Sequence, residues 1–463
     1  MTTTRHAEQQ AHWIIAQAEE GRLSGARESR LLAGYSGTGY VTLFEQPGDY
    51  VEVDFTLEAA GSYVLYMRYA LPHKDQRNHL YVDGIHYGDM VNARSDSFAI
   101  AELCTVHLES GVHTVRLAKS GGGIMVDYLA LAPLSPRQPL PFSLSNPNAT
   151  PEARGVMRYL AEIHGHCMLT GQHTVAADGP ELAFIEEKTG KLPALRGYDL
   201  MSYSHYTETE LPTEHKRWEI EVNAGSIESA IDWYRNRGGL VTFCWHWFSP
   251  LGGEDKTFYT WHTNFDLTRA LIEGTPEHEA LLSDMDAGAD ALRKLQDANV
   301  PVLWRPLHEA DGGWFWWGAQ GAEPYKKLWR LMYDRYTNFH GLHNLIWVWN
   351  APHPDWYPGG DVVDLAGADI YNAKGNHGPL TFWHDYTSLM TGHSKPVALT
   401  ENGPILDPEL VRKTRTPWLW NMVWGGGFVT DGASTSFDML SQAYNHPYCI
   451  TLDQLPDWNP SGT

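Results

Sequence analysis

The amino-terminal part of the chain consists of short stretches in which apolar and polar residues alternate. Between about Ile14 and Leu131 these stretches are separated by turn residues and read YVEVDFTL, SYVLYMRYA, HLYVDG, HTVRLAKSGGG and IMVDYLAL. Alternation places apolar side chains on one face of a strand. Turn signals at a spacing of roughly 8–12 residues are typical of packed antiparallel sheets. The pattern therefore predicts an all-β domain, a jelly-roll or β-sandwich, over residues 1–133.

The pattern changes after residues 134–150, which are rich in Pro, Ser and Asn and which we interpret as a linker. From 151 to 463, apolar runs of strand length alternate with amphipathic helical stretches such as 277–298 and 325–339. Eight such runs occur: HCMLTGQH, LPALRGYDL, GGLVTFCWHW, VPVLWRPLHE, HNLIWVWN, VVDLAGADIYN, KPVALTENG and WLWNMVWGGG. Eight strand–helix repeats predict an α/β fold, a (β/α)8 TIM barrel.

Composition restricts the kind of partner. The 463 residues carry 34 Lys and Arg against 56 Asp and Glu, a net charge of −22, and this acidic chain is expected to repel nucleic acid and anionic membranes. The sequence contains 19 Trp, and indole rings are well suited to stack on the apolar faces of sugars, so a neutral polymer is a natural ligand.

Neither cysteine chemistry nor a targeting segment is indicated. Cys104, Cys167, Cys244 and Cys449 show neither a paired framework nor a metal-binding spacing, and we expect them to be free and mostly buried. The amino-terminal residues MTTTRHAEQQAHW lack an apolar core and a cleavage site, and no window holds 18 uninterrupted apolar residues. We expect a chain that does not span a membrane.

The candidate chemistry lies at the ends of predicted barrel strands. Strand four ends at His308-Glu309, four aromatic residues follow from Trp314, and strand seven ends at Glu401. Residues at the carboxyl ends of barrel strands project into the mouth where substrate enters, so we expect both glutamates to face it, Glu401 as an exposed carboxylate and Glu309 desolvated by the aromatic residues behind it, which raises its pKa. A glycosidase needs two carboxyl groups at the scissile bond, and Glu309 and Glu401 are the two best candidates.

Two other hydrolytic chemistries are disfavoured. A zinc enzyme is the obvious rival for a chain with 23 His, but no H-E-x-x-H motif is present. We also expect His308 and Glu309 to lie on an extended segment and so to point in opposite directions rather than at one ion. Serine-based hydrolysis is disfavoured because no G-x-S-x-G motif occurs.

Five motifs, RPLHE, GGWFWWG, DIYN, TENG and WGGG, make residues 146–460 resemble glycoside hydrolase family 26. Most known members are endo-β-1,4-mannanases; a minority are β-1,3-xylanases, mixed-linkage glucanases or exo-enzymes that release mannobiose. Members act with retention of configuration. The resemblance implies that Glu309 is the acid/base, that Glu401 is the nucleophile and that catalysis uses no cofactor.

The same resemblance assigns roles to residues around the two carboxyl groups. Tyr371 would hydrogen-bond the nucleophile, Trp314 would shape the surroundings of the acid/base, His308 would contact the sugar, and Trp424 would form a platform beneath it. From their strand-end positions, we expect Trp245, His246 and Trp247 to line the sugar-binding side, Arg305 and Asn350 to orient the site from behind, and Gln172 and His173 to lie at its rim.

The amino-terminal domain resembles a family 35 carbohydrate-binding module through AQAEEG, SGTGYV, LYVDG and VDYLAL, which occur in the family's order. That resemblance implies a structural Ca²⁺ held by Gln17, Glu19 and Asp127, and oxygen ligands suit this ion. Gln17 stands where the family usually has an acid, which removes one charge. Tyr40 and Tyr87 are either sugar-stacking platforms or core residues.

The sequence thus predicts a retaining endo-β-1,4-mannanase that acts on mannan, galactomannan or glucomannan. It leaves three alternatives: the same machinery acting on β-1,3-xylan or mixed-linkage β-glucan, an exo-enzyme that releases mannobiose, and a non-catalytic glycan-binding protein. We expect a monomer that binds β-mannan and manno-oligosaccharides. Because such a polymer normally lies outside the cell, we expect the protein to be secreted.

Overall fold

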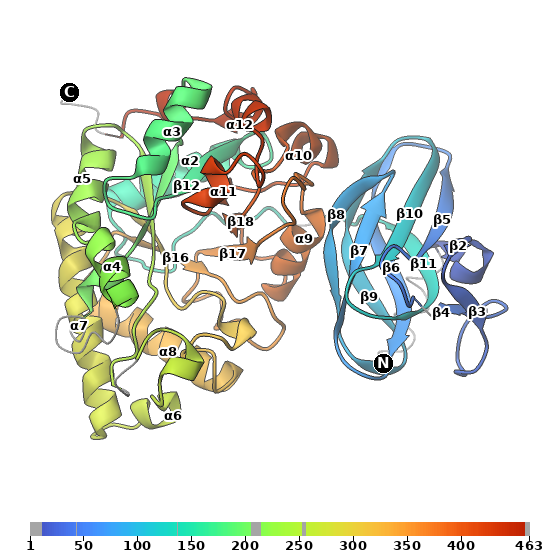
Figure 1. The fold of residues 1–463 in the computed structure, drawn as a ribbon, viewed down its shortest axis with the longest axis horizontal. Helices are drawn as coiled ribbons and strands as arrows, with labels where there is room; N and C mark the ends of the chain where they lie inside the picture. The colour runs from blue at the N-terminus through green and yellow to red at the C-terminus, as the bar shows by residue number, and fades with distance from the viewer. Residues whose placement is uncertain (1–11, 43, 137, 205–213, 252–255, 459–463) are drawn as a thin grey trace. The chain divides into compact units, whose positions relative to one another are not determined.

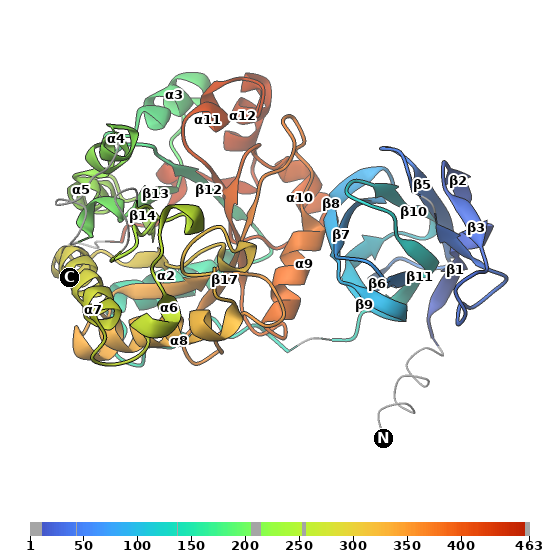
Figure 2. The ribbon, with the colours of Figure 1, turned by 60° about the horizontal axis from the view of Figure 1, so that its bottom comes forward.

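A computed structural model describes residues 12–42, 44–136, 138–204, 214–251 and 256–458. Residues 1–11, which belong to the segment considered above for a targeting signal, lie outside this description. The chain forms two compact units, and the first is made chiefly by the described residues up to Pro139. Figures 1 and 2 show an antiparallel sandwich in blue and an α/β barrel in green to red.

The first unit is a sandwich of two antiparallel sheets, as predicted. One sheet has the order β3-β4-β11-β6-β9, with β1 paired to β11, and the other has the order β2-β5-β10-β7-β8. The strands of the first sheet are β1 (Ile14–Gln17), β3 (Arg27–Ser29), β4 (Tyr40–Thr42), β6 (Gly61–Leu71), β9 (Ser95–Leu108) and β11 (Met125–Pro133). The strands of the second are β2 (Arg22–Ser24), β5 (Tyr50–Leu57), β7 (Gln76–Val82), β8 (Ile85–Asn92) and β10 (Gly111–Lys119).

Alternation along the strands builds the sandwich core. In β5 the residues Val51, Val53 and Phe55 are buried while the residues between them are partly or fully exposed, as a strand with one covered face requires. Tyr40 and Tyr87 are 2% and 3% exposed, so both belong to this core and neither offers a face to a sugar.

The second unit is a closed barrel of eight parallel strands. Their order is β13-β14-β15-β16-β17-β18-β19-β12, β12 pairs back with β13, and the short β20 (Cys449–Ile450) lies beside β12. The eight strands are β12 (Met168–His173), β13 (Leu195–Asp199), β14 (Leu240–Cys244), β15 (Val302–Arg305), β16 (Leu345–Trp349), β17 (Leu365–Ile370), β18 (Val397–Asn402) and β19 (Trp420–Val423). Each lies within one of the eight predicted runs, so the barrel prediction is confirmed.

Helices surround the barrel strands (Figure 1). They are α2 (Pro151–Ile163), α3 (Pro180–Thr189), α4 (Glu214–Asn223), α5 (Ser226–Arg235), α6 (Leu267–Ala270), α7 (Pro276–Asp297), α8 (Ala322–Asp334), α9 (Thr381–Met390), α10 (Pro408–Thr414), α11 (Gly427–Thr430) and α12 (Phe437–Tyr444). The two helical stretches singled out in the sequence correspond to α7 and to α8 with the π-helical turn η6 (Arg335–Phe339) that continues it.

The barrel strands read as nearly unbroken apolar runs because both of their faces are covered. Every residue of β13, β14, β15 and β16 is buried, with helices outside and packed side chains inside. Polar residues enter these strands mainly at their carboxyl ends, at Asp199 in β13 and Arg305 in β15. The apolar runs therefore form the core of the barrel, and the side chains at the ends of the strands are available for catalysis and binding.

The connection from β11 to α2 contains no helix or strand among its described residues. Its last residues are fixed to the barrel: the backbone N–H of Ser145 donates to Asp364 at 2.5 Å, and that of Thr150 donates to the His343 carbonyl at 2.9 Å. All four cysteines are free, and three of them are buried, as expected. Within the described part of the chain, no helix combines the length and the apolar character needed to span a membrane.

Candidate active site

The segment after β15 positions Glu309 through an unusual backbone. Leu307 and Glu309 have φ angles of 54° and 53°, a left-handed conformation that costs energy for residues other than glycine. The Glu309 N–H donates to the Asn350 carbonyl at 2.8 Å, and Glu309 then begins the short 3-10 helix η5 (Ala310–Gly312). The segment is therefore a turn, and the prediction that His308 and Glu309 lie on an extended strand is wrong.

Glu401 lies within β18, beside Asp369 of β17. A register irregularity follows Ala368 and places Asp369 directly opposite Glu401 in the parallel pair. Glu401 is only 3% exposed, so the expectation of an exposed carboxylate at the barrel mouth is wrong for this residue. Burial means that its charge must be matched by protein groups rather than by water.

Three carboxyl groups meet at this point. One oxygen of Glu309, one of Asp369 and one of Glu401 all lie within 4.8 Å of one another. Glycosidases that retain configuration place their two catalytic carboxyl groups about 5–5.5 Å apart, whereas inverting enzymes need a wider gap for a water molecule. The structure therefore brings the two predicted catalytic residues together at the shorter of the two separations.

Arg305 supplies the positive charge beneath these groups. Its Nη1 donates to Asp369 Oδ2 at 2.6 Å, its Nη2 bonds Glu401 Oε1, and its side chain is 1% exposed. Burial alone would lower the pKa of this guanidinium, but the charges of Asp369 and Glu401 raise it well above its usual value. Arg305 therefore holds the carboxyl groups of Asp369 and Glu401 together from a buried position.

Asp369 completes this buried network. Asn350 donates to Asp369 Oδ1 at 2.7 Å, and the Thr400 hydroxyl donates to the same oxygen at 2.6 Å. Burial raises the pKa of Asp369 to about 7, although the charge of Arg305 opposes that shift and the charge of Glu401 adds to it. Asp369 thus helps to hold Arg305 in place, and Asp369 and Glu401 share the positive charge of Arg305.

The second oxygen of Glu401 faces the open side of the site. The Tyr371 hydroxyl, from the residue after β17, donates to Glu401 Oε2 at 2.6 Å. Burial and the nearby charge of Glu401 raise the pKa of Tyr371, so the phenol keeps its proton and remains a donor. Both oxygens of Glu401 therefore accept a hydrogen bond, one from a cation and one from a phenol.

Glu309 has different surroundings. Burial raises its pKa to about 9, and the charges of Glu401 and Asp369 contribute to the rise. Trp314, which is 40% exposed, donates its indole N–H to Glu309 Oε2 at 2.9 Å. At neutral pH Glu309 therefore holds a proton, as a general acid must.

Two histidines form a chain beside the carboxyl groups. His246 Nδ1 lies 2.5 Å from Asp199 Oδ2, and His246 Nε2 lies 3.2 Å from His308 Nε2. Burial would lower the pKa of His246, but Asp199 raises it, whereas burial and the charge of Arg305 lower the pKa of His308 well below its usual value. His308 is thus a neutral ring whose orientation depends on His246 and Asp199.

Of the three ring residues predicted to line the site after β14, His246 lines a surface pocket. Trp245 and Trp247 are 1% and 0% exposed and stack on each other at 4.2 Å. The Trp247 indole N–H also bonds Asp284 at 2.5 Å. The structure corrects their expected role: both indoles pack in the core, because consecutive residues of an extended segment point to opposite sides.

The pocket beside the carboxyl groups has aromatic walls. Its lining includes His173, Trp218, His246, Tyr259 and Trp424. The Trp424 ring packs on His173 at 4.6 Å, and the backbone of Trp424 accepts a bond from Gln172 at 3.1 Å. His173 and Gln172 are buried and belong to β12, so they support Trp424 rather than lie at the rim.

Three residues of this site were not identified from the sequence: Asp199, Asp369 and Thr400. Both aspartates occupy the carboxyl end of a barrel strand, the position that drew attention to Glu401, and Asp369 lies in the quoted motif DIYN. A rule that marks every carboxylate at a strand end would have found both. Thr400 carries no such signal, because threonine is common in strands.

The residues predicted to hold Ca²⁺ also converge, in the sandwich. The Ser36 N–H donates to Asp127 Oδ1 at 2.8 Å, the Ser36 hydroxyl donates to Gln17 Oε1 at 3.1 Å, and the Thr38 N–H donates to Glu19 Oε1 at 2.7 Å. Glu19 Oε2 is buried without a hydrogen-bond partner among the described residues. Arg68 pairs with Asp127 and reduces the net negative charge of the group.

Comparison with known families divides the chain into two matched regions. Residues 145–454 match the family described as glycosyl hydrolase family 26, and residues 14–134 match carbohydrate binding module family 35. The first match contains every residue of the carboxylate cluster described above. The second contains Gln17, Glu19 and Asp127.

Similar proteins and a solved structure match nearly the whole length of the chain. A mannan endo-1,4-β-mannosidase of Thermothelomyces thermophilus is 38% identical over 456 residues, which cover 96% of this chain and 91% of that protein. Mannan endo-1,4-β-mannosidase A of Piromyces sp is 33% identical over 96% of this chain and 73% of its own length. A crystal structure of a Podospora anserina GH26-CBM35 β-(1,4)-mannanase is 35% identical, covers 96% of this chain and 99% of that chain, and superposes with a TM-score of 0.65.

Proposed function

The chain belongs to glycosyl hydrolase family 26, with an amino-terminal module of carbohydrate-binding family 35, and from that premise we propose that it is a retaining endo-β-1,4-mannanase. The observation that carries the proposed mechanism is the pair Glu309 and Glu401, with oxygens within 4.8 Å and opposite surroundings. The endo-mannanase names of the relatives in Thermothelomyces thermophilus and Piromyces sp support the substrate and the mode of cleavage.

In the first step the Glu401 carboxylate attacks the anomeric carbon, and the bond from that carbon to the glycosidic oxygen breaks. Glu309 gives its proton to the leaving oxygen, which departs as the free hydroxyl of the released chain. Arg305 and Tyr371 hold the two oxygens of Glu401 in place, so the attacking atom needs little reorganisation.

In the second step a water molecule attacks the same carbon from the face vacated by the leaving chain. Glu309, now ionised, accepts the proton from this water, and Glu401 leaves as a carboxylate. The two inversions give net retention. A pKa raised to about 9 suits Glu309 to this cycle, because the residue returns readily to the protonated form at neutral pH.

The substrate-binding side follows from the aromatic pocket. Trp424 offers a flat face beside His246, and sugar rings place their C–H faces on such indoles. His246 lines this pocket, whereas His308 is fully buried and bonds His246, so the expectation that His308 itself contacts the sugar is wrong. The alternative of a non-catalytic glycan-binding protein is disfavoured, because the chain keeps both carboxyl groups together with the arginine and tyrosine that hold one of them.

Rescue by azide tests the two roles. The substrate is an aryl β-mannobioside with a good leaving group. Glu401→Gly with azide should yield the α-glycosyl azide, because azide occupies the space of the missing carboxylate and attacks the anomeric carbon with a single inversion. Glu309→Gly should yield the β-glycosyl azide, because azide intercepts the intermediate held by Glu401. Products are identified by proton NMR of the anomeric position.

Asp369→Asn serves as the matched control for the third carboxyl group of the cluster. It should slow the enzyme without forming a glycosyl azide, because Asp369 lies behind Arg305 and does not reach the reacting carbon. Exchange of the two azide anomers between the glutamate variants would reverse the assignment. A wild-type product released first as the α-anomer would contradict retention.

The substrate is tested by product analysis on linear β-1,4-mannan, β-1,3-xylan and mixed-linkage β-glucan. Mixed manno-oligosaccharides from mannan alone support the proposal, and mannobiose as the sole early product would indicate an exo-enzyme. Activity on another polymer alone would keep the mechanism and change the specificity. We also propose that the protein acts outside the cell as a monomer, which cell fractionation and light scattering test.

We further propose that Gln17, Glu19 and Asp127 hold a structural Ca²⁺. The unpartnered Glu19 Oε2 and the Gln17 amide oxygen supply the hard oxygen atoms that this ion prefers. Calcium should raise the melting temperature of the chelator-treated protein, because an ion that binds only the folded state stabilises it. Glu19→Gln should abolish this rise, and the neighbouring exposed Glu20→Gln should preserve it; a rise unchanged in Glu19→Gln would overturn the proposal.

A further inference from the structure

The hairpin formed by β7 and β8 carries three side chains that share one face of the second sandwich sheet. His79 of β7 lies directly opposite Asp89 of β8 in the antiparallel register. Directly opposed residues place their side chains on the same face of a sheet. Leu80, the next residue of β7, is buried in the core, so His79 and Asp89 belong to the outward face.

An irregularity in β8 brings a second histidine to this face. His86 and Asp89 are three residues apart, and on a regular strand they would point to opposite faces. The register shifts between Leu80 and Tyr81, however, and Gly88 has a φ angle of 127° that side chains rarely tolerate. Such a bulge re-aims the side chains beside it. His86 therefore joins Asp89 on the outward face.

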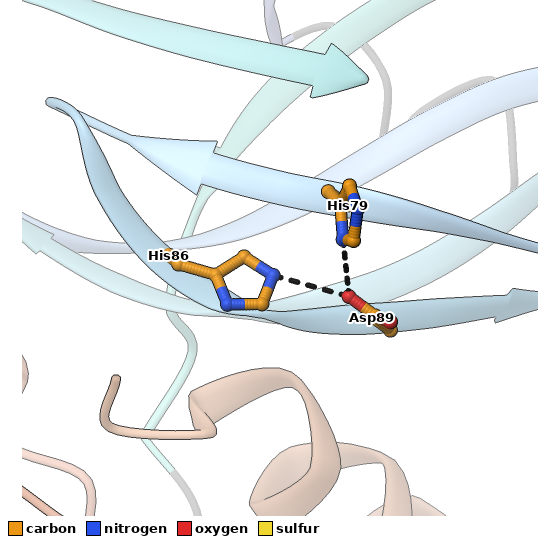
Figure 3. A group of neighbouring side chains, drawn as sticks. All are labelled: His79, His86 and Asp89. Carbon is orange, nitrogen blue, oxygen red and sulfur yellow. Dashed lines mark hydrogen bonds and ion pairs between the residues drawn. The ribbon is translucent and has the colours of Figure 1, made fainter. Parts of the chain in front are cut away.

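Figure 3 shows both imidazole rings directed at the Asp89 carboxylate. His79 Nδ1 lies 2.5 Å and His86 Nε2 lies 3.1 Å from Asp89 Oδ1, and one ligand atom from each residue lies within 4.8 Å of the others. The side chains of His79 and Asp89 are 33% and 31% exposed, and that of His86 is 12% exposed. An ion could therefore reach the group from solvent.

The charge on this group suits a cation. Burial would raise the pKa of Asp89, but hydrogen bonds to His79 and His86 lower it below its usual value, so Asp89 is a carboxylate. The Tyr81 ring flanks both imidazoles, at 6.2 Å from His79 and 5.0 Å from His86. Ring packing of this kind restricts how the imidazoles can turn.

We propose that His79, His86 and Asp89 form a binding site for Zn²⁺ or another divalent transition-metal ion in the sandwich. Two imidazole nitrogens and one carboxylate oxygen are a ligand set that zinc accepts, and a hard ion such as Ca²⁺ would require more oxygen ligands. The three protein ligands leave one position of a tetrahedron for water. This site is separate from the predicted calcium ligands and does not depend on the proposed mannanase activity.

The three side chains could hold a metal ion after only a small adjustment of the present contacts. Ligands about 2.0 Å from a tetrahedral zinc ion lie about 3.3 Å apart, and the pair of His86 and Asp89 is already at 3.1 Å. The pair of His79 and Asp89 would have to open by less than 1 Å, which is about one side-chain adjustment. Bound zinc would link edge strand β8 to β7 and stabilise the free edge of the sheet.

The test uses the tag-free full chain after chelator treatment. Isothermal titration with zinc chloride should show one equivalent bound by the wild-type protein, and its melting temperature should rise with zinc. His86→Ala and Asp89→Asn should each lose this equivalent and the rise. His113→Ala is the matched control, because His113 also pairs with an aspartate, Asp83 at 2.7 Å, but has no second histidine beside it.

Circular dichroism without zinc shows whether each variant is folded. Asp89→Asn keeps the size of the side chain, so it still tests the proposal if His86→Ala does not fold. Binding should also weaken from pH 7.5 to pH 5.5, because protons compete for the imidazole nitrogens. The proposal is overturned if the wild-type chain binds no zinc. It is equally overturned if folded His86→Ala and Asp89→Asn retain the equivalent, which would place zinc elsewhere, such as at the group of Asp199, Cys244 and His246.

Discussion

The two sides of the active site hold the same functional group in contrasting surroundings. Glu401 lies in the barrel wall, where Arg305 and Tyr371 each donate to one of its oxygens. Glu309 lies on a turn beyond the barrel wall, where its carboxyl group accepts a hydrogen bond from the indole of Trp314 and burial raises its pKa to about 9. One side therefore stabilises negative charge by direct bonds, and the other disfavours it.

This difference shows how one residue type can carry out two roles. A pair of titratable groups divides into acid and nucleophile when its surroundings favour opposite protonation states. Here the cation lies on the side of Glu401, the proposed nucleophile, and the partly exposed indole lies on the side of Glu309, the proposed acid. Variants that change either set of neighbours should therefore affect the two roles separately.

The largest effect is expected from removing the shared cation. Arg305→Met should lower kcat by about 10²- to 10³-fold, because Glu401 loses the group that orients it. It should also cost about 3–5 kcal/mol of unfolding free energy, because Asp369 and Glu401 would remain buried without a cation. Steady-state kinetics on manno-oligosaccharides and urea unfolding measure the two losses.

Arg305→Lys is the control for this variant. An ammonium keeps the charge but cannot bond both carboxylates in the geometry of the guanidinium, so a smaller loss of kcat is expected than for Arg305→Met. Equal activity of wild type and Arg305→Met would show that the cation has no part in orienting Glu401.

The next largest effect concerns the neutral donor to Glu401. Tyr371→Phe should reduce kcat about 10- to 100-fold, which corresponds to one hydrogen bond to a charged group. The loss should appear mainly in formation of the glycosyl–enzyme, because attack by Glu401 occurs in that step. Pre-steady-state release of the aryl group measures this loss, and an unchanged burst rate would contradict the role of Tyr371. Tyr159→Phe, on helix α2 and outside the aromatic pocket, is the control.

The sequence predicted the fold because barrel and sandwich strands follow simple periodic rules. Largely apolar runs marked β14 to β16, and alternation marked β5 in the sandwich. The backbone at Leu307 and Glu309 could not be predicted in this way, since a left-handed conformation at these residues depends on long-range contacts such as the bond from Glu309 to Asn350.

Motifs and strand-end positions predicted part of the active site. Glu309, Glu401 and Tyr371 were identified, whereas Asp369 and Asp199 act through partners that are distant in sequence, Arg305 and His246. The misassigned indoles of Trp245 and Trp247 show a second limit. Sequence reveals that aromatic residues gather at a strand end, but burial decides which of them face the pocket.

A smaller effect should separate the two influences of Trp314 on Glu309. In Trp314→Phe an aromatic ring remains, but the indole N–H that donates to Glu309 is lost. Because this hydrogen bond lowers the pKa of Glu309, the basic limb of the kcat/KM profile should move to higher pH. In Trp314→Ala water reaches the carboxyl group, so the limb should move below the wild-type position near pH 9, by up to about one pH unit.

The profiles are measured from pH 6 to pH 10 on an aryl mannobioside, with stability at each pH checked by preincubation. Trp261→Phe is the control, since this indole is 64% exposed and stacks on Tyr259 rather than bonding Glu309. Shifts of the same sign in Trp314→Phe and Trp314→Ala would mean that one of the two influences is absent.

The last expected effect is on stability, where the acid side of the site should be a weak point. Between its usual pKa of 4.5 and its raised pKa of about 9, Glu309 holds a proton in the folded protein that the unfolded chain has released. The folded state then binds more protons than the unfolded state, so this residue lowers stability as pH rises through that window. Glu309→Gln cannot ionise and should escape this loss, with almost no gain at pH 4.5 and a gain that grows by about 1.4 kcal/mol per pH unit towards pH 8. Melting temperatures of wild type and Glu309→Gln at both pH values measure the gain, and Glu162→Gln, at an exposed position of α2, is the control. A gain that is equal at the two pH values would show that it arises from packing or hydrogen bonding rather than from the buried proton, and the contrast between the two glutamates would then rest on Glu401 alone.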